Sequence, residues 1–382
     1  MAEKMAHVDT FAADNLSPRD QWSAFTFDRP EFQCPGRMNC ATELLDNQVA
    51  AGLGGKAVFY TLRETWTYGE LRERTNRIAR VLIEDFAIEL GNRVMIRAAN
   101  NPMFVACWFA VAKASVVVVA VIPLLRAGEL ATIVEKAQMG LALCDARLAE
   151  DMEEARRRAP VCERICYFSG SGEAGAAAEL GDRAGTKPAD LENVDTVRDD
   201  VVLITFTLGT TGQLKGTMHF HRDIITMCDA FPRSCLEEAL DDIFIGSPPI
   251  AFTFDLGGQV AFPMRVGAST VLLEPPPPED LLRALRTSRR PSASRRRQPT
   301  GPCALFSKGS ISRPCASTSR PARPCPCPSS RRGAPPPGSA SSTAWAQPRC
   351  CTSSSRRPTT RFASAPRANP FPATRPGSPM TR

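Results

Sequence analysis

The feature that most limits the fold of this chain is a regular alternation of short apolar runs with longer amphipathic segments. Apolar, strand-like runs occupy residues 93–98, 116–121, 141–144, 164–168 and 201–206. Helical spacing of apolar residues fills the stretches between them at 68–85, 102–113, 127–137 and 146–158. Such alternation is typical of β-α-β units, in which parallel sheets carry helices on both faces. We therefore expect an α/β fold, with residues 169–192 as a long surface excursion.

Charge divides the chain into two parts. All 40 acidic residues lie at or before Asp280, together with 27 basic residues, whereas the 102 residues that follow hold 20 basic residues and no acid. The net charge of +7 thus splits into −13 and +20. The later part also lacks apolar periodicity and cannot bury a core. We expect a partial α/β domain at 1–286 and a disordered tail rich in Arg, Pro and Ser at 287–382.

The first part has the character of a cytoplasmic protein. Residues 1–25 lack the continuous apolar region of a secretory signal, and the apolar stretch 103–125 is interrupted by Lys113 and closed by Pro123. Its β-branched second half favours a helix followed by a buried strand over a membrane span. Eight cysteines lie in this part without a C-x-x-C pair, so we expect reduced, structural thiols.

A Gly- and Thr-rich loop follows the last apolar run. It reads T-L-G-T-T-G-Q-L-K-G over residues 207–216. Glycines let backbone N–H groups approach an anion, threonine hydroxyls add donors, and the lysine adds a positive charge. The spacing does not match a Walker loop, and the alternative of a plain hairpin turn leaves the lysine and threonines unexplained. The residues expected to contact phosphate are Thr207, Gly209, Thr210, Thr211, Gly212, Lys215 and Gly216.

This loop resembles the signature [ST]-S-G-T-T-G-x-P-K-G of the AMP-forming acyl-CoA synthetases, in the adenylate-forming superfamily. The resemblance runs from about Glu31 to Leu273, and its departures are Leu208 for serine and Leu214 for proline. Benzoate and 2-aminobenzoate CoA ligases are the most similar members, through residues 100–103, 123–126, 251–254 and 265–269. The resemblance implies the large N-terminal domain of such enzymes.

The reaction implied by the resemblance has two steps. An aromatic carboxylate attacks Mg-ATP to give an acyl-adenylate and pyrophosphate, and coenzyme A then displaces AMP. The cofactors and co-substrates implied are therefore ATP, Mg²⁺ and coenzyme A. No membrane partner and no specific nucleic-acid partner is expected.

The resemblance also assigns residues outside the loop. His221 precedes a helix and is placed near the nucleotide, although local packing at the helix start is an equal alternative. Phe252, Phe254 and Gly257 are expected to line the acyl pocket, in a segment that we interpret as a strand. Asp255 would polarise that pocket. We expect no protein metal site, because the two histidines at 219 and 221 have no carboxylate or cysteine at ligand spacing.

The tail admits three interpretations: a basic nucleic-acid arm, a disordered linker, or out-of-frame translation. The arm is disfavoured because Lys308 is the only lysine and aromatics are scattered. Reading one nucleotide upstream, residues 344–352 permit G-L-G-S-T-E-M-L-H, in which Trp345 and Ala346 force the second glycine. Residues 292–303 permit C-I-A-A-P-T-A-Y-R-A-M. Both strings resemble family segments in the right order, which indicates a one-base slip near residues 286–288.

The slip would affect function. The magnesium-binding glutamate, the ribose-binding aspartate and the small C-terminal domain with its adenylation lysine would be missing from the polypeptide. We therefore expect an acid-CoA ligase by descent whose activity is impaired. The alternative is a non-enzymatic product, either a nucleotide-binding remnant or a basic-tailed interaction protein.

Sequencing the coding DNA across codons 286–288 tests the slip. We expect that a one-base correction restores a frame that continues the family pattern. A clean open frame that encodes the printed tail would contradict the hypothesis.

Overall fold

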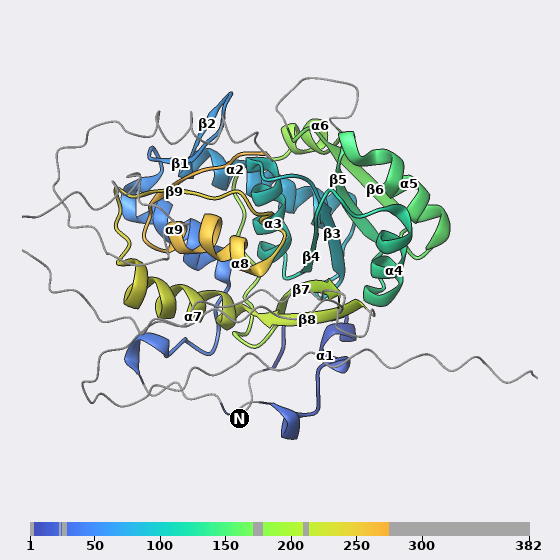
Figure 1. The fold of residues 1–382 in the computed structure, drawn as a ribbon, viewed down its shortest axis with the longest axis horizontal. Coiled ribbons are helices and arrows are strands. Elements are labelled where there is room, and N and C mark those ends of the chain that lie inside the picture. Colours follow the sequence, from blue (N-terminus) through green and yellow to red (C-terminus); the bar gives the residue numbers. More distant parts are fainter. Residues whose placement is uncertain (1–3, 23, 25–28, 171–178, 209–213, 275–382) are drawn as a thin grey trace, which may run out of the picture.

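The computed structural model describes residues 4–22, 24, 29–170, 179–208 and 214–274, which form the fold in Figure 1. The predicted tail at 287–382 lies outside the described residues. The expectation of an α/β fold is confirmed, since helices and strands alternate along the chain. Within the described ranges, no helix is long and apolar enough to cross a membrane.

A six-stranded sheet forms the larger half of the fold. Its strands, in spatial order, are β6 (Arg164–Phe168), β5 (Leu141–Asp145), β3 (Arg93–Arg97), β4 (Val117–Val121), β7 (Val201–Leu208) and β8 (Leu214–Phe220). All neighbours pair in parallel except β7 and β8, which are antiparallel. The expected parallel pairing is confirmed from β6 to β7, and β8 adds an antiparallel strand at this edge. Residues 214–216, expected to belong to the loop, are the first residues of strand β8, and the helix expected after His219 and Phe220 begins at His221.

Strand β4 shows why the sheet needs helices on both faces. Val118 and Ala120 point into a core shared with α2 (Tyr68–Arg80) and α3 (Pro102–Lys113). Val117, Val119 and Val121 point the other way, into a core with α4 (Ala127–Ala137) and α5 (Ala149–Arg158). Successive side chains of a strand alternate between faces, so five consecutive apolar residues require cover on both sides.

A second sheet has four strands, in the order β2 (Thr65–Thr67), β1 (Ala57–Tyr60), β10 (Ser269–Val271) and β9 (Ile243–Ile245). β10 pairs in parallel with both β1 and β9, while β2 is antiparallel to β1. Helices α2 and α3 pack together, and one continuous core contains residues from them and from both sheets. Figure 1 shows these two helices between the sheets.

The remaining helices are shorter or lie at the periphery. The α-helices are α1 (Phe11–Asp14), α6 (Glu179–Gly185), α7 (His221–Phe231), α8 (Thr253–Asp255) and α9 (Phe262–Arg265). The 3-10 and π segments are η1 (Arg19–Gln21), η2 (Pro30–Phe32), η3 (Thr42–Asp46), η4 (Val49–Leu53), η5 (Val81–Asp85), η6 (Ala146–Leu148), η7 (Pro232–Leu236) and η8 (Leu256–Ala261).

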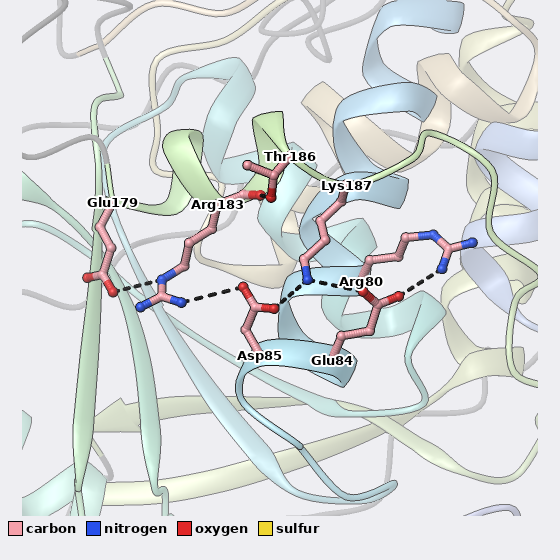
Figure 2. Close-up of polar contacts among 7 residues, drawn as sticks. All are labelled: Arg80, Glu84, Asp85, Glu179, Arg183, Thr186 and Lys187. Atoms are coloured by element: carbon pink, nitrogen blue, oxygen red, sulfur yellow. Dashed lines mark hydrogen bonds and ion pairs between the residues drawn. The ribbon is translucent and has the colours of Figure 1, made fainter.

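Helix α6 lies within residues 169–192, the segment expected to be a long surface excursion. Ion pairs between alternating positive and negative side chains connect this helix and the residues after it to η5, as Figure 2 shows. Arg183 donates to Glu179 (3.0 Å) and to Asp85 (3.4 Å), and Lys187 pairs with Asp85 and Glu84. Exposed pairs of this kind contribute about 0–1 kcal/mol each. The helix is thus stabilised by partners about 100 residues away in the chain, which local sequence patterns do not reveal.

A buried ammonium group joins α3 to two other elements, α2 and η3. The Lys113 side chain is fully buried, and its Nζ donates to Asp46 Oδ1 (2.6 Å) and Asn76 Oδ1 (2.8 Å). Asn193 donates to the second oxygen of Asp46 (2.6 Å). Burial lowers the pKa of Lys113, while Asp46 opposes that shift. The network ties α3 to α2 and η3, so its loss would leave a charged or polar group without a partner.

We predict that Lys113→Met lowers the free energy of unfolding by about 3–5 kcal/mol, because it leaves the Asp46 carboxylate without its buried cation. Urea unfolding of the full chain measures the change. Lys187→Met, in the exposed network of Figure 2, is the control and is expected to cost about 1 kcal/mol or less. Equal effects of the two substitutions would contradict the prediction.

Candidate functional site

Two consecutive asparagines after β3 connect the two sheets. Asn100 Nδ2 donates to the carbonyl of Pro248 (2.7 Å), and its Oδ1 accepts from the N–H of Ile250 (2.9 Å), in the segment that follows β9. Asn101 Nδ2 donates to Glu274 Oε1 (3.1 Å), just beyond β10. The carboxyl ends of strands from both sheets therefore meet here. In open α/β folds this is the edge at which ligands bind.

An ion cluster reinforces this junction. Arg147, after β5, donates two hydrogen bonds to Glu274 (2.7 and 2.6 Å) and two to Asp145 (3.0 and 2.6 Å). The Arg147 hydrogen bonds lower the pKa of Glu274, and Glu274 and Asp145 together raise the pKa of Arg147. A Cβ on Gly170 would lie 2.3 Å from Asp145 Oδ2 and 2.4 Å from Asn101 Nδ2. Only glycine fits at that position.

These polar contacts were not all foreseeable from the sequence. The asparagine pair after a predicted strand is a usable signal, because polar residues at the carboxyl end of a buried strand often face a ligand site. Arg147 and Glu274 carry no such signal, since they are 127 residues apart and each looks like an ordinary surface charge.

The predicted phosphate loop joins the two antiparallel strands β7 and β8. Thr207 pairs in register with Lys215, and Phe206 with Gly216. Thr207 is exposed, Lys215 half-buried and Gly216 buried. The other predicted contacts, Gly209, Thr210, Thr211 and Gly212, lie outside the described residues. The two arms of a hairpin are therefore present, and the phosphate contacts of the residues between them stay a prediction.

The position of the loop follows from β7. This strand runs parallel to β4, so its carboxyl end lies at the same edge of the sheet as the end of β3 and its asparagine pair. Lys136 Nζ also donates to the Leu214 carbonyl (2.9 Å) and so attaches the start of β8 to α4.

The predicted acyl-pocket segment is helical and not a strand. The N–H of Phe252 donates to the Pro249 carbonyl (3.1 Å), and the N–H of Leu256 donates to the Phe252 carbonyl (2.9 Å), so the chain turns into α8. The prolines at 248 and 249 supply no backbone donor for a strand ladder. Phe252 is 37% exposed and Phe254 63%, so neither is a core residue.

Gly257 faces the core. It is buried in η8, and an added Cβ would lie 2.9 Å from the ring of Phe262. Gly257 therefore allows close packing of η8 on Phe262. Its predicted place in the acyl pocket stays a prediction.

Asp255 lies on the inner side of the same turn and is buried. Burial raises the pKa of its carboxyl group, against a lowering effect of the hydrogen bond from Gln259 Nε2 (3.1 Å). The same Nε2 donates to the Pro248 carbonyl (3.0 Å). A Cβ on Gly246 would lie 2.8 Å from the Gln259 side chain, so this glycine leaves room for the contact.

His221 is the first residue of α7 and is buried. Its Nδ1 accepts from the N–H of Cys40 (3.1 Å) and lies 3.2 Å from Cys40 Sγ. Burial lowers the pKa of His221 to about 3 and that of His219 to about 4. The described contacts of His221 are core contacts, which is the packing alternative, and its place near the nucleotide stays a prediction.

No set of three or more His, Cys, Asp or Glu side chains in the described part is placed to hold a metal ion. The eight cysteines of the described ranges are free thiols, and six of them are buried.

Comparison with known proteins assigns the chain to a family. Residues 45–290, well over half of the chain, match the family of AMP-binding enzymes, and the chain belongs to this family. It is 28% identical over 258 residues to a benzoate–CoA ligase of Thauera aromatica, a match that covers 67% of this chain and 48% of that one. It is 26% identical over 243 residues to a 4-hydroxybenzoate–CoA/benzoate–CoA ligase of Rhodopseudomonas palustris, covering 63% and 44%.

Solved structures share the fold. The anthranilate CoA ligase AuaEII in complex with anthranoyl-AMP superimposes with a TM-score of 0.62 at 23% identity, covering 68% of this chain and 49% of that one. ATP-bound MatB from Rhodopseudomonas palustris gives 0.58 at 22%, covering 65% and 47%. The chain spans about half the length of the curated relatives that it matches.

We predict that mild acid destabilises the fold through its histidines. Burial lowers the pKa values of His7, His219 and His221 from 6.5, so the folded chain binds fewer protons than the unfolded chain. Their contribution is complete above pH 6.5 and is lost as the pH falls towards 4 and then 3. Each histidine adds a slope of at most about 1.4 kcal/mol per pH unit.

Urea unfolding at a series of pH values measures this slope. His221→Gln is expected to reduce the slope between about pH 6 and pH 4, because one titrating group is removed. A slope unchanged by the substitution would contradict the prediction.

Proposed function

We propose that this chain is the AMP-binding part of an AMP-forming acid-CoA ligase that activates an aromatic carboxylate of the benzoate or 2-aminobenzoate type. The observation that carries the proposal is a convergence at the carboxyl ends of the parallel strands. The end of β7, from which the predicted phosphate loop continues, lies at the same edge as Asn100, which holds residues 248–254, the aromatic segment. The similarity to benzoate–CoA ligases, and the fold shared with an anthranilate ligase, support the substrate class.

In the first step, a carboxylate oxygen of the acid attacks the α-phosphorus of Mg-ATP, and the bond from that phosphorus to pyrophosphate breaks. Thr207 and Lys215 are register partners, so their side chains lie on the same face of the hairpin. The hydroxyl and the ammonium group would hold the β- and γ-phosphates and stabilise the charge of the leaving pyrophosphate. The thiol of coenzyme A then displaces AMP to form the thioester.

The aromatic ring of the acid would lie against Phe252 and Phe254. Both side chains project from a turn whose neighbours, Ile250 and Ala251, are buried. Flat apolar surfaces of this kind favour an aryl group over a small polar acid. The buried Asp255 behind the turn would disfavour a carboxylate there and so direct the acid group towards the loop.

We further propose that adenylation is impaired in this chain as written. In the family that the sequence resembles, carboxylates for Mg²⁺ and for ribose come after the acyl-pocket segment. The 102 residues after Asp280 contain neither aspartate nor glutamate. A one-base slip near residues 286–288 would account for this composition.

Benzoate-dependent exchange of pyrophosphate into ATP tests the proposal. We expect weak exchange from the chain as written and exchange that is higher by on the order of 10²–10³ after the frame is restored, since transition-state stabilising groups return. Lys215→Ala should abolish the signal in both, whereas Lys187→Ala, in the surface network of Figure 2, should not.

Two results would count against the proposal. If the frame-restored chain shows no exchange with benzoate or 2-aminobenzoate, the substrate class is wrong. If the chain as written matches the restored chain, the proposed impairment is wrong.

A further inference from the structure

The backbone of the aromatic segment is held by one side chain from the other sheet. Asn100 is 6% exposed and uses both ends of its amide, as donor to Pro248 and as acceptor from Ile250. These two bonds span 148 and 150 residues of sequence and resemble the pairing of a short strand. They fix both the position and the orientation of the peptide units that precede Phe252.

The side-chain amide of Gln259 also holds the Pro248 carbonyl. Gln259, which is fully buried, also donates to the Pro248 carbonyl (3.0 Å). Ile250 and Ala251 are buried directly after the anchored residues, whereas Phe252 and Phe254 are partly or largely exposed. Residues 248–250 are thus held by hydrogen bonds, whereas the aromatic side chains that follow them are exposed.

We infer that Asn100 is a positioning residue for the acyl pocket, which acts by anchoring residues 248–250 so that Phe252 and Phe254 are presented to an aromatic acid. This inference rests on the proposed function. A side chain held in one geometry before binding loses less conformational entropy when the ligand arrives. Asn100 contacts the backbone of residues 248–250, so we expect it to act on the acid through that backbone and not by touching the reacting atoms.

A matched control distinguishes positioning from ordinary structural support. Asn39 is also 6% exposed, and its amide donates to the Ala112 carbonyl (2.9 Å) and accepts from the N–H of Ala41 (3.0 Å). Asn39→Ala removes the same kind of contacts at the same burial, but at residues outside the aromatic segment. The two alanine variants are therefore expected to lose similar stability.

The experiment uses the full chain with three variants: Asn100→Ala, Asn100→Asp and Asn39→Ala. Hydrogen exchange at the Ile250 amide and the affinity for benzoate are measured for each, with the melting temperature as the stability reference. In Asn100→Ala we expect exchange at Ile250 to rise about tenfold, the equivalent of one hydrogen bond, and benzoate affinity to fall by about the same factor. Asn39→Ala should change neither beyond about twofold.

Asn100→Asp tests the anchor without a change of shape. The carboxylate keeps the acceptor for the Ile250 N–H and loses the donor to Pro248, which Gln259 still supplies. Its second oxygen faces the Pro248 carbonyl where the donor was, so we expect exchange at Ile250 to rise and benzoate affinity to fall, both less than in Asn100→Ala. If Asn100→Ala fails to fold, a rise in exchange with unchanged benzoate affinity in Asn100→Asp overturns the positioning role.

The outcomes separate the two proposals. Equal changes in Asn100→Ala and Asn39→Ala would overturn the positioning role, and so would a selective rise in exchange with unchanged benzoate affinity. Failure of the unaltered chain to bind benzoate would instead overturn the proposed function, and a selective rise in exchange would then still support the hold of Asn100 on the segment.

Discussion

Burial of strand β4 on both faces is the constraint on which the rest of the structure depends. Its five residues, Val117–Val121, are all buried, and the strand pairs in parallel with β3 and β7. A strand without a polar face cannot lie at a surface, so helices must cover both sides. Parallel pairing then brings the carboxyl ends of the strands to one edge. The location of the candidate site is thus a consequence of packing, before any functional residue is considered.

Polar contacts fix how the strand ends of the two sheets are aligned. The apolar cores hold α2 and α3 against both sheets, but they do not fix how the strand ends meet. That alignment comes from directional contacts: the asparagine pair at 100–101 and the Arg147–Glu274 pair. Hydrogen bonds and bidentate ion pairs specify distance and angle, which apolar contacts do not.

Much of the fold was predictable from local sequence patterns. Helix α3 begins at Pro102 and ends at Lys113, as expected, because Asn101 caps it and Pro102 suits its first turn. Strand β6 also has its predicted bounds. The strand β8 was missed because Gly216 and the neighbouring polar residues resemble a loop, and only its pairing with β7 makes it a strand. The turn at 252–255 was misassigned because its geometry depends on Asn100, far away in sequence.

Gly170 is expected to tolerate substitution poorly, although it has no side chain that could take part in binding or catalysis. It lies close to Asn101, which follows β3, and to Asp145, the last residue of β5. Asn101 and Arg147 in turn contact Glu274, which follows β10. Even the smallest side chain, a methyl group, would have to displace a carboxylate oxygen and an amide nitrogen together. A single added carbon atom at residue 170 would therefore displace side chains that contact the strand ends of both sheets.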